Sequence, residues 1–441
     1  MKRTEEKVEE KNFISIQEAM DNAEKNHYVN LRGWCYRERK SNARAFVVLR
    51  DHSNIIQCII EKEQFPEIKW DELKDVSIEC ALEVSGTIAK DSRAPTGYEI
   101  KVSDFNVVSK AERFPITKDQ STEFLLDVRH LWLRSRHLTN VMKVKSAVLR
   151  ASREFFEKNK YFEVTPPIIT GSSCEGGSTL FEIKYFGEKA YLSQSAQLYL
   201  EALIFSLERV WSLTPSFRAE QSRTVRHLAE YWHLEAEAAW LDFEGLLKFE
   251  EEMISHICHR TAELVPDELK QLGRDPEELK KIIPPFPRIT YGEALELLKK
   301  DGVNLPWGED IRTLEEEQLM THFDKPLIVM KYPKKIKAFY MKEDAENPDV
   351  VLCCDILAPE KYGEIIGSSE RETDYAKIVQ RLNESGEDIK NYTWYLDLRK
   401  YGGVQHSGFG LGIERIVRWF CKLEHVRDTI PFPRTINRAY P

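Results

Sequence analysis

The side chains best suited to chemistry lie between Val210 and Trp240, in the segment VWSLTPSFRAEQSRTVRHLAEYWHLEAEAAW. Polar residues alternate there with apolar ones along two stretches that a polar loop joins. The polar positions are Ser212, Thr214, Ser216, Arg218 and Glu220 in the first stretch, and His233, Glu235 and Glu237 in the second. Because alternate residues of a strand point to the same face, we expect a hairpin with one polar face. The apolar positions are bulky enough for a core, so the polar face either makes hydrogen bonds and charge pairs or is an ordinary solvated surface.

Two later segments add a cation and two acids. GFGLGIERIVRWF, from Gly408 to Phe420, places Arg415 at the start of a predicted helix. Its glycines do not form a GxGxxG pattern and do not follow a first strand, which argues against a dinucleotide-binding fold. Asp355 and Glu364 lie in VLCCDILAPEKYGEIIGSSER, and two carboxylates that face a polyphosphate can hold a hard cation such as Mg²⁺. Taken alone, two acids this far apart are also typical of a protein surface.

These segments resemble the motifs of the class II aminoacyl-tRNA synthetases. FRAE and the following RxxRHLAEYWHLE resemble motif 2, an ATP-binding antiparallel hairpin, and GFGLGIER resembles motif 3. The helical periodicity of Val141–Lys160, followed by KNKYFEVTPPIIT with Pro167, resembles motif 1, which builds the dimer interface. The resemblance implies an α+β multidomain protein. Its parts would be an N-terminal OB-fold β-barrel and a class II antiparallel sheet flanked by helices.

The resemblance also implies a site for ATP and Mg²⁺, in which arginines stabilise the charge that develops during adenylate formation. The implied catalytic residues are Arg218, on the α-phosphate, and Arg415. The implied ATP ligands are Arg218, Glu220, Arg226, His227, Tyr231, Glu364 and Arg415, and the implied metal ligands are Asp355 and Glu364. Tyr231 and Arg415 would stack on the two faces of adenine, and Glu220 would accept from its amino group. The spacing from Asp355 to Glu364 is longer than in typical aspartyl enzymes.

The amino-acid pocket is the most specific part of the resemblance. CEGGSTLF resembles the mobile loop that closes over the amino acid, and Gln197 in LSQSAQLYLEA matches a ligand of the α-amino group. Where aspartyl enzymes have a lysine and an aspartate, this chain has Leu200 and Glu235, while Arg371 is retained. A pocket that lacks this lysine and keeps an acid suits a substrate whose side chain is a neutral amide. A substrate with a side-chain carboxylate would leave polar groups of the pocket unpaired and would bind poorly. The implied amino-acid ligands are Glu175, Ser195, Gln197, Glu235, Arg371 and His406.

This combination resembles the asparaginyl-tRNA synthetases of the archaeal/eukaryotic type, which implies asparagine, ATP and tRNA(Asn) as substrates and a homodimer formed through the motif 1 helix. Three alternatives stay open. The same catalytic fold occurs in aspartyl-tRNA synthetases and in tRNA-independent asparagine synthetases, and a non-catalytic RNA-binding paralogue is a third possibility. The last is disfavoured by the joint presence of Arg218, Glu364 and Arg415.

The sequence pattern of the N-terminal part predicts a β-barrel that binds nucleic acid. Five short β runs separated by turn-rich pieces fill the range 29–110, a pattern typical of an OB fold. The order RGWxY, AFVVLRD, IIQ resembles the anticodon-binding barrel of the aspartyl/asparaginyl enzymes. The implied anticodon-binding residues are Arg37, Phe46, which would stack on a base, and Gln57, which would hydrogen-bond the central base. A basic cluster accompanies them: Arg32, Arg37, Arg39, Lys40 and Arg44.

Length and composition set the remaining expectations. The 441 residues suffice for two or three domains, and 42% hydrophobic with 31% charged residues is typical of a globular protein. A net charge of −9 does not exclude tRNA, since a local basic patch can oppose the net sign. Eight scattered cysteines without a CxxC pair, a polar N-terminus and no long apolar run favour the cytoplasm and no membrane. The expected divisions are an extension over 1–28, the barrel over 29–110, a hinge over 111–140 and the catalytic domain over 141–441, with an α/β insertion around 289–343.

Overall fold

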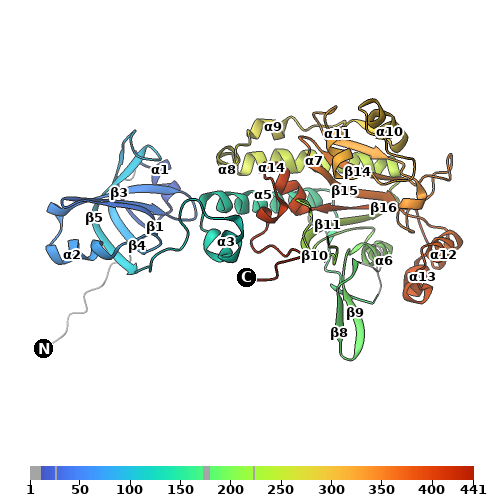
Figure 1. Ribbon diagram of the computed structural model, residues 1–441, viewed down its shortest axis with the longest axis horizontal. Helices are drawn as coiled ribbons and strands as arrows, with labels where there is room; N and C mark the ends of the chain where they lie inside the picture. Colours follow the sequence, from blue (N-terminus) through green and yellow to red (C-terminus); the bar gives the residue numbers. More distant parts are fainter. Residues whose placement is uncertain (1–10, 25–26, 172–178, 222–223) are drawn as a thin grey trace. The chain divides into compact units, whose positions relative to one another are not determined.

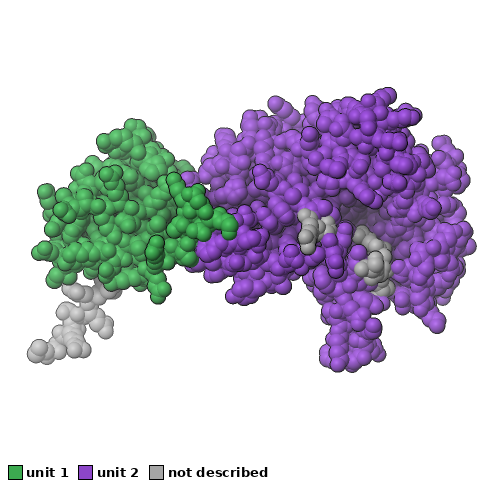
Figure 2. Space-filling view, viewed as in Figure 1, with its two compact units in different colours: residues 1–121 green, residues 122–441 purple. Residues whose placement is uncertain are grey.

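The computed structural model describes residues 11–24, 27–171, 179–221 and 224–441. The chain forms two compact units, residues 1–121 and residues 122–441, which Figure 2 distinguishes by colour. The boundary falls in a segment with little regular structure between the last strand of the first unit and the first helix of the second. Each unit has its own hydrophobic core.

The first unit is a closed five-stranded barrel with the strand order β1-β2-β3-β5-β4 (Figure 1), which confirms the predicted OB fold. Its elements are α1 (Ile16–Asp21), β1 (Tyr28–Lys40), β2 (Arg44–Arg50), β3 (Ile55–Glu61), α2 (Glu67–Glu72), β4 (Ala81–Lys90) and β5 (Tyr98–Ser109). In β2, the residues Ala45, Val47 and Leu49 point into the core, so Phe46 lies on the outer surface of the barrel. Part of the N-terminal extension belongs to this unit, because Ile16 of α1 is buried in the barrel core.

The second unit is built on an eight-stranded sheet with the order β12-β13-β14-β15-β16-β11-β10-β6. Its strands are β6 (Phe162–Glu163), β10 (Arg209–Phe217), β11 (Glu230–Ala239), β12 (Arg288–Thr290), β13 (Leu327–Met330), β14 (Cys353–Ala358), β15 (Gly363–Glu370) and β16 (His406–Gly412). The pairs β12–β13 and β10–β6 are parallel, and the others are antiparallel. The predicted class II sheet is therefore present. Its central strand β16, the last in the sequence, lies between β15 and β11.

Helices surround this sheet as predicted (Figure 1). They are α3 (Thr122–Asp127), α4 (Arg129–Trp132), α5 (Arg136–Lys158), α6 (Gln197–Leu207), α7 (Phe243–Leu264), α8 (Pro266–Gln271), α9 (Pro276–Lys280), α10 (Tyr291–Lys300), α11 (Thr313–Leu319), α12 (Tyr375–Glu384), α13 (Thr393–Lys400) and α14 (Ile413–Phe420). The helix expected over Val141–Lys160 begins earlier, at Arg136, because the Ser135 side chain caps it by accepting from Leu138 N. No helix among these described residues is long and apolar enough to cross a membrane.

A small three-stranded sheet and an edge extension complete the unit. The small sheet has the order β7-β9-β8 and consists of β7 (Ile169–Thr170), β8 (Glu182–Tyr185) and β9 (Glu188–Leu192), of which the β8–β9 hairpin projects from the unit (Figure 1). The range 289–343 contributes α10, α11 and β13, and β13 pairs with β14. This range thus extends the large sheet as well as covering it.

Strand alternation separates the core face of the large sheet from its polar face. Leu234 and Ala236 of β11, and Phe409 and Leu411 of β16, share one core with helices α5, α7 and α14. The intervening residues point the other way. They are His233, Glu235 and Glu237 in β11, and Gly408 and Gly410 in β16.

Candidate functional site

The predicted polar hairpin is β10 and β11, which pair antiparallel with Ser212 opposite Glu235 and Thr214 opposite His233. The polar residues of the two strands therefore share one face, as the alternation predicts. On β16, the neighbouring strand of the same sheet, glycines leave room for the β11 side chains. A Cβ at Gly408 would overlap the Glu237 carboxylate, and a Cβ at Gly410 would overlap the His233 ring. The glycines of GFGLG thus allow close approach of side chains, and they do not bind phosphate through a turn.

The first of two neighbouring pockets collects most of the residues predicted to bind ATP. Its lining residues are Arg218, Arg226, His227, Leu228, Tyr231, His233, Glu364, Ile365, Gly410, Gly412, Glu414, Arg415 and Val426. Six of the seven predicted ATP ligands are in this set, and Glu220 is the exception. Its carboxylate Oε2 lies 3.9 Å from His227 Nε2, beside the pocket.

Arginines give this pocket its charge. Arg218 lies over the Tyr231 ring, with 5.6 Å between the guanidinium carbon and the ring centroid. Arg415 Nη1 donates to Glu364 Oε2 at 2.9 Å and to the Glu364 carbonyl at 3.0 Å. Burial alone would raise the pKa of Glu364, but nearby cations, Arg415 foremost, outweigh it and hold the pKa at about 2. Burial and the charge of Arg415 lower the pKa of His227, so its ring favours the neutral form.

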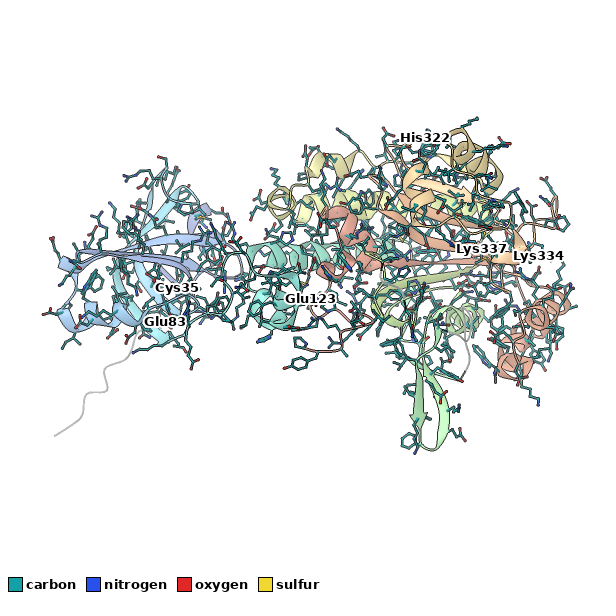
Figure 3. All side chains as sticks on the ribbon, in the orientation of Figure 1. Cys35, Glu83, Glu123, His322, Lys334 and Lys337 are labelled. Atoms are coloured by element: carbon teal, nitrogen blue, oxygen red, sulfur yellow. The ribbon has the colours of Figure 1, made fainter. Side chains whose placement is uncertain are left out.

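The two predicted metal ligands face the same point of the sheet. Asp355 Oδ1 and Glu364 Oε1 lie 3.6 and 3.5 Å from the position that a Cβ would take at Gly367. Asp355 Oδ2 also accepts from the Lys337 ammonium at 2.7 Å. Lys337, labelled in Figure 3, comes from the segment between β13 and β14. Two carboxylate donors fit a Mg²⁺ ion that takes its other ligands from phosphate and water.

A second pocket adjoins the first and collects residues predicted to bind the amino acid. Its lining residues are Ser195, Gln197, Arg218, His233, Glu235, Lys337, Tyr340, Met341, Asp355, Glu364, Gly367, Ser368, Arg371, Phe409 and Gly410. Arg218, His233, Glu364 and Gly410 line both pockets. A ligand that fills both pockets therefore passes Arg218.

Glu235 is the buried acid of this second pocket. Its Oε1 accepts from the Ser195 hydroxyl and its Oε2 accepts from Ala196 N at 2.8 Å, while His233 Nδ1 lies 3.4 Å away. Among the described residues, no lysine or arginine forms an ion pair with Glu235. Burial raises the pKa of Glu235 to about 7, even though its hydrogen-bond donors act in the opposite direction.

Two cations of the second pocket, Arg371 and Lys337, are already matched by acids. Arg371 forms a two-nitrogen ion pair with Glu237 and donates to Ser369 Oγ at 2.6 Å. Lys337 pairs with Asp355, as described above. Leu200, at the position where aspartyl enzymes have a lysine, is fully buried in an apolar cluster with Ala196, Ile204, Val210 and Ala239.

Glu201 organises the ligands beneath the second pocket. Its Oε1 accepts from Gln197 Nε2 at 3.0 Å, and its Oε2 accepts from Arg399 Nη2 and Tyr395 Oη, each at 2.7 Å. His406 Nε2 lies 3.0 Å from the same Oε2, and His406 does not line either pocket. The structure thus places His406 below the site, where it contacts Glu201, and brings Gln197 to the pocket wall.

The sequence alone did not mark Lys337 or Glu201 as site residues. Lys337 belongs to the basic run KYPKKIK, which reads as a solvated surface, and Glu201 follows Leu200 in an apolar helix. The partners that reveal them, Asp355 and Arg399, are distant in the sequence. Glu175, predicted to lie near the α-amino group, falls outside the described residues.

The barrel presents its own concave surface around Phe46. Two adjoining hollows meet there, and Phe46, Arg44, Glu61 and Gln64 line both. Gln57 lines one of them and donates to Glu99 Oε2 at 3.3 Å. Arg37 lies elsewhere, with its guanidinium 5.3 Å from the Tyr36 ring centroid. Phe46 and Gln57 are thus brought together on one surface with Arg39, Lys40, Arg93 and Lys101 around them.

Each of the two structural units matches a known protein family. Residues 121–436 match the family model of the class II tRNA synthetases (D, K and N), and residues 29–108 match that of the OB-fold nucleic acid binding domain. The asparagine–tRNA ligase of Thermococcus gammatolerans is 54% identical over 413 residues, which cover 94% of this chain and 96% of that protein. The asparagine–tRNA ligase of Thermoplasma acidophilum is 50% identical over 97% of this chain and 100% of that protein.

A solved structure is similar over nearly the whole chain. Asparaginyl-tRNA synthetase from Pyrococcus horikoshii, complexed with asparaginyl-adenylate, superimposes with a TM-score of 0.94 at 48% identity, covering 98% of this chain and 100% of that one. Motifs, fold, paired pockets and relatives agree, and the chain belongs to the class II aminoacyl-tRNA synthetases, in the family of the asparagine–tRNA ligases.

Proposed function

We propose that the protein activates asparagine with ATP and transfers it to the 3′ end of tRNA(Asn). The observation that carries the proposal is the pocket around Glu235, a buried acid that forms no ion pair with a lysine or arginine among the described residues. Such a group accepts from the amide of asparagine and repels the carboxylate of aspartate. The relatives' activity supports the same assignment.

In the first step, a carboxylate oxygen of asparagine attacks the α-phosphorus of ATP and pyrophosphate leaves. Arg218 lines both pockets, so it can contact the reacting carboxylate and the α-phosphate together. Arg415 and Tyr231 are proposed to hold the nucleotide, and Arg226 and His227, which line the same pocket, to contact the terminal phosphates. In the second step, a hydroxyl of the terminal adenosine of tRNA attacks the carbonyl carbon and AMP leaves.

Within the second pocket, each polar side chain has a separate task. Glu235 accepts from the amide nitrogen, and Arg371 donates to the amide oxygen while Glu237 holds its guanidinium in place. Gln197 holds the amino end of the substrate, and Ser195, which donates to Glu235, is a further proposed ligand of the amino acid. Glu175 is proposed as a further ligand of the α-amino group. His406 supports Gln197 through Glu201.

Asp355 and Glu364 are the proposed ligands of Mg²⁺, which supplies electrostatic stabilisation of the phosphates when it is bound. Asp355 would exchange its contact with Lys337, and Glu364 its contact with Arg415, as the nucleotide enters. The ligand-free arrangement keeps the Glu364 carboxylate ionised and holds both cations nearby. When ATP and Mg²⁺ bind, Lys337 and Arg415 would then be free to contact the phosphates, and the two carboxylates to bind the metal ion.

The barrel is proposed to bind the anticodon, with Phe46 stacking on a base and Gln57 hydrogen-bonding the central base. Lys40, Arg39 and Arg44 give the surrounding surface the cations that phosphates require. Arg37 is also proposed to contact the tRNA. We also propose a cytoplasmic location, in keeping with the free cysteines of the described residues.

A homodimer is proposed to form through the motif 1 region. β6 is an edge strand of the large sheet, and its Phe162 is 55% exposed. Ile169 of β7, at the edge of the small sheet, is 44% exposed. Exposed apolar residues on unpaired edges are typical of strands that another chain covers. A second copy of this chain would cover both edges near α5.

Asparagine-dependent pyrophosphate exchange tests the choice of amino acid. Exchange with asparagine should exceed exchange with aspartate by at least about a hundredfold at neutral pH, because aspartate leaves buried polar groups unpaired. Since burial raises the pKa of Glu235 to about 7, Glu235 is ionised above that pH and protonated below it. The preference should narrow as the pH falls from about 8 to about 6, because a protonated Glu235 can donate to aspartate.

Glu235→Gln should abolish most asparagine-dependent exchange and remove this pH dependence, with nucleotide binding retained. Glu230→Gln, on the same strand but outside both pockets, is the matched control. A preference for aspartate in the wild-type enzyme, or full activity of Glu235→Gln, would contradict the proposed role.

The nucleotide site is tested by Arg415→Ala. The rate of adenylate formation should fall about a hundredfold or more, the scale of losing one charged contact to the transition state. Lys422→Ala changes a cation just beyond the end of α14, outside both pockets, and should leave exchange unchanged. Near-normal exchange by Arg415→Ala would rule out the motif 3 assignment.

The anticodon surface is tested by Phe46→Ala, assayed by aminoacylation and by exchange without tRNA. Loss of one stacked base, about 1–3 kcal/mol, should weaken aminoacylation about tenfold to a hundredfold. Exchange should not change, because Phe46 belongs to the barrel unit. Val48→Ala removes an apolar side chain from the same strand outside the two hollows and is the control. Equal loss in both assays would show that Phe46 serves only the fold.

The dimer is tested by sedimentation at micromolar concentration. The wild-type protein should sediment with twice the mass of one chain, and Phe162→Asp should shift it toward the monomer because a charge would be buried at the interface. Ile68→Asp, which places the same charge at an exposed apolar position of the barrel, is the control. An active wild-type monomer would refute the proposal.

A further inference from the structure

A glutamate outside the three sequence motifs contacts the nucleotide pocket. Glu316 lies on α11, in the range 289–343 that extends the large sheet. Its Oε2 accepts from Arg226 Nη1 at 2.6 Å and from the backbone nitrogen of Glu364 at 2.9 Å. One carboxylate oxygen therefore joins the motif 2 loop to the start of strand β15.

The contact is buried and closely packed. The side chains of Arg226 and Glu316 are only 5% and 8% exposed. Gly363, at the start of β15, has a φ of +73°, and a Cβ there would overlap Glu316 Oε2 and lie 2.5 Å from Arg226 Nη1. A side chain at position 363 would separate the two ions, so the glycine is needed both for its backbone conformation and for this contact.

The contact also controls charge in the pocket. Arg226 lines the nucleotide pocket and helps to keep the Glu364 carboxylate ionised. The charge of Arg226 also acts on Glu364, the proposed metal ligand. Glu316 thus holds Arg226 at the pocket wall and also fixes the backbone from which the Glu364 side chain extends.

We propose that Glu316 is a positioning residue of the nucleotide site, which sets the Arg226 guanidinium and the Glu364 carboxylate at the separation that the ATP phosphates require. The proposal rests on the function proposed above for Arg226 and Glu364. It gives the range 289–343 a part in catalysis, because α11 supplies a contact that neither motif 2 nor β15 provides for itself.

The test compares Glu316→Ala and Glu316→Gln in asparagine-dependent pyrophosphate exchange. Loss of a buried charge-assisted hydrogen bond should raise the KM for ATP about tenfold or more in Glu316→Ala. The KM for asparagine should stay within about twofold, since Glu316 does not line the second pocket. Glu316→Gln keeps an acceptor oxygen and should recover part of the loss.

The double variant Arg226→Ala with Glu316→Ala supplies a further readout. If both side chains act through one contact, adding Glu316→Ala to Arg226→Ala should raise the KM for ATP by less than about threefold, far below the product of the single effects. Glu317→Ala, the neighbouring acid on the same helix, is the control and should behave as wild type.

The Glu316 and Arg415 variants distinguish a failure of the proposed role of Glu316 from a failure of the proposed nucleotide site. An unchanged KM for ATP in Glu316→Ala overturns the inference, and so does an equal rise in both KM values together with a lower melting temperature, which marks a purely structural role. Near-normal exchange by Arg415→Ala overturns the nucleotide site itself, and the inference with it. A selective rise in the KM for ATP, with an impaired Arg415→Ala, establishes it.

Discussion

The catalytic unit depends on the matching of buried charge. An ion without a partner in a protein interior costs several kcal/mol, and five cations in and around the two pockets are joined to acids. The pairs are Arg371 with Glu237, Arg399 with Glu201, Arg226 with Glu316, Lys337 with Asp355 and Arg415 with Glu364. The first three orient side chains and are almost fully enclosed. The last two are more exposed and border the substrate pockets, so their partners can change when a charged ligand enters.

This division gives the two adjoining pockets opposite characters. In the nucleotide pocket, Arg218, Arg226 and Arg415 leave positive charge for a triphosphate. In the proposed amino-acid pocket, Arg371 and Lys337 are paired with acids, and Glu235 has no ion-pair partner from lysine or arginine among the described residues. Under the proposed function, a neutral amide would meet an acceptor there, and a second carboxylate would meet repulsion. On this proposal, selectivity would depend on the pairing of Arg371 and Lys337 as well as on Glu235 itself.

Local patterns predicted the parts of the protein in which neighbours in sequence are neighbours in space. Alternation gave the β10–β11 hairpin with its polar face, and short β runs gave the five-stranded barrel. Motif resemblance led to Arg218 and Arg415, which line one pocket. Lys337, Glu201 and Glu316 were missed because their partners come from distant segments, and no local pattern marks a buried lysine or glutamate. His406 was predicted to bind the amino acid. In the structure its ring contacts Glu201, which is distant in the sequence, and His406 does not line either pocket.

The place of β16 in the sheet has a consequence for how the protein is made. β10 with β11 and β14 with β15 can each pair as soon as they are synthesised, but they are joined only through β16, which ends at Gly412. Until nearly the whole chain has left the ribosome, β11 and β15 keep open edges, and unpaired edges invite pairing with other chains. The strand that completes the sheet also carries the glycines that accommodate His233 and Glu237. A nascent chain that stops before it has therefore neither a continuous sheet nor an active site, and it exposes two edges to the cell's chaperones and proteases.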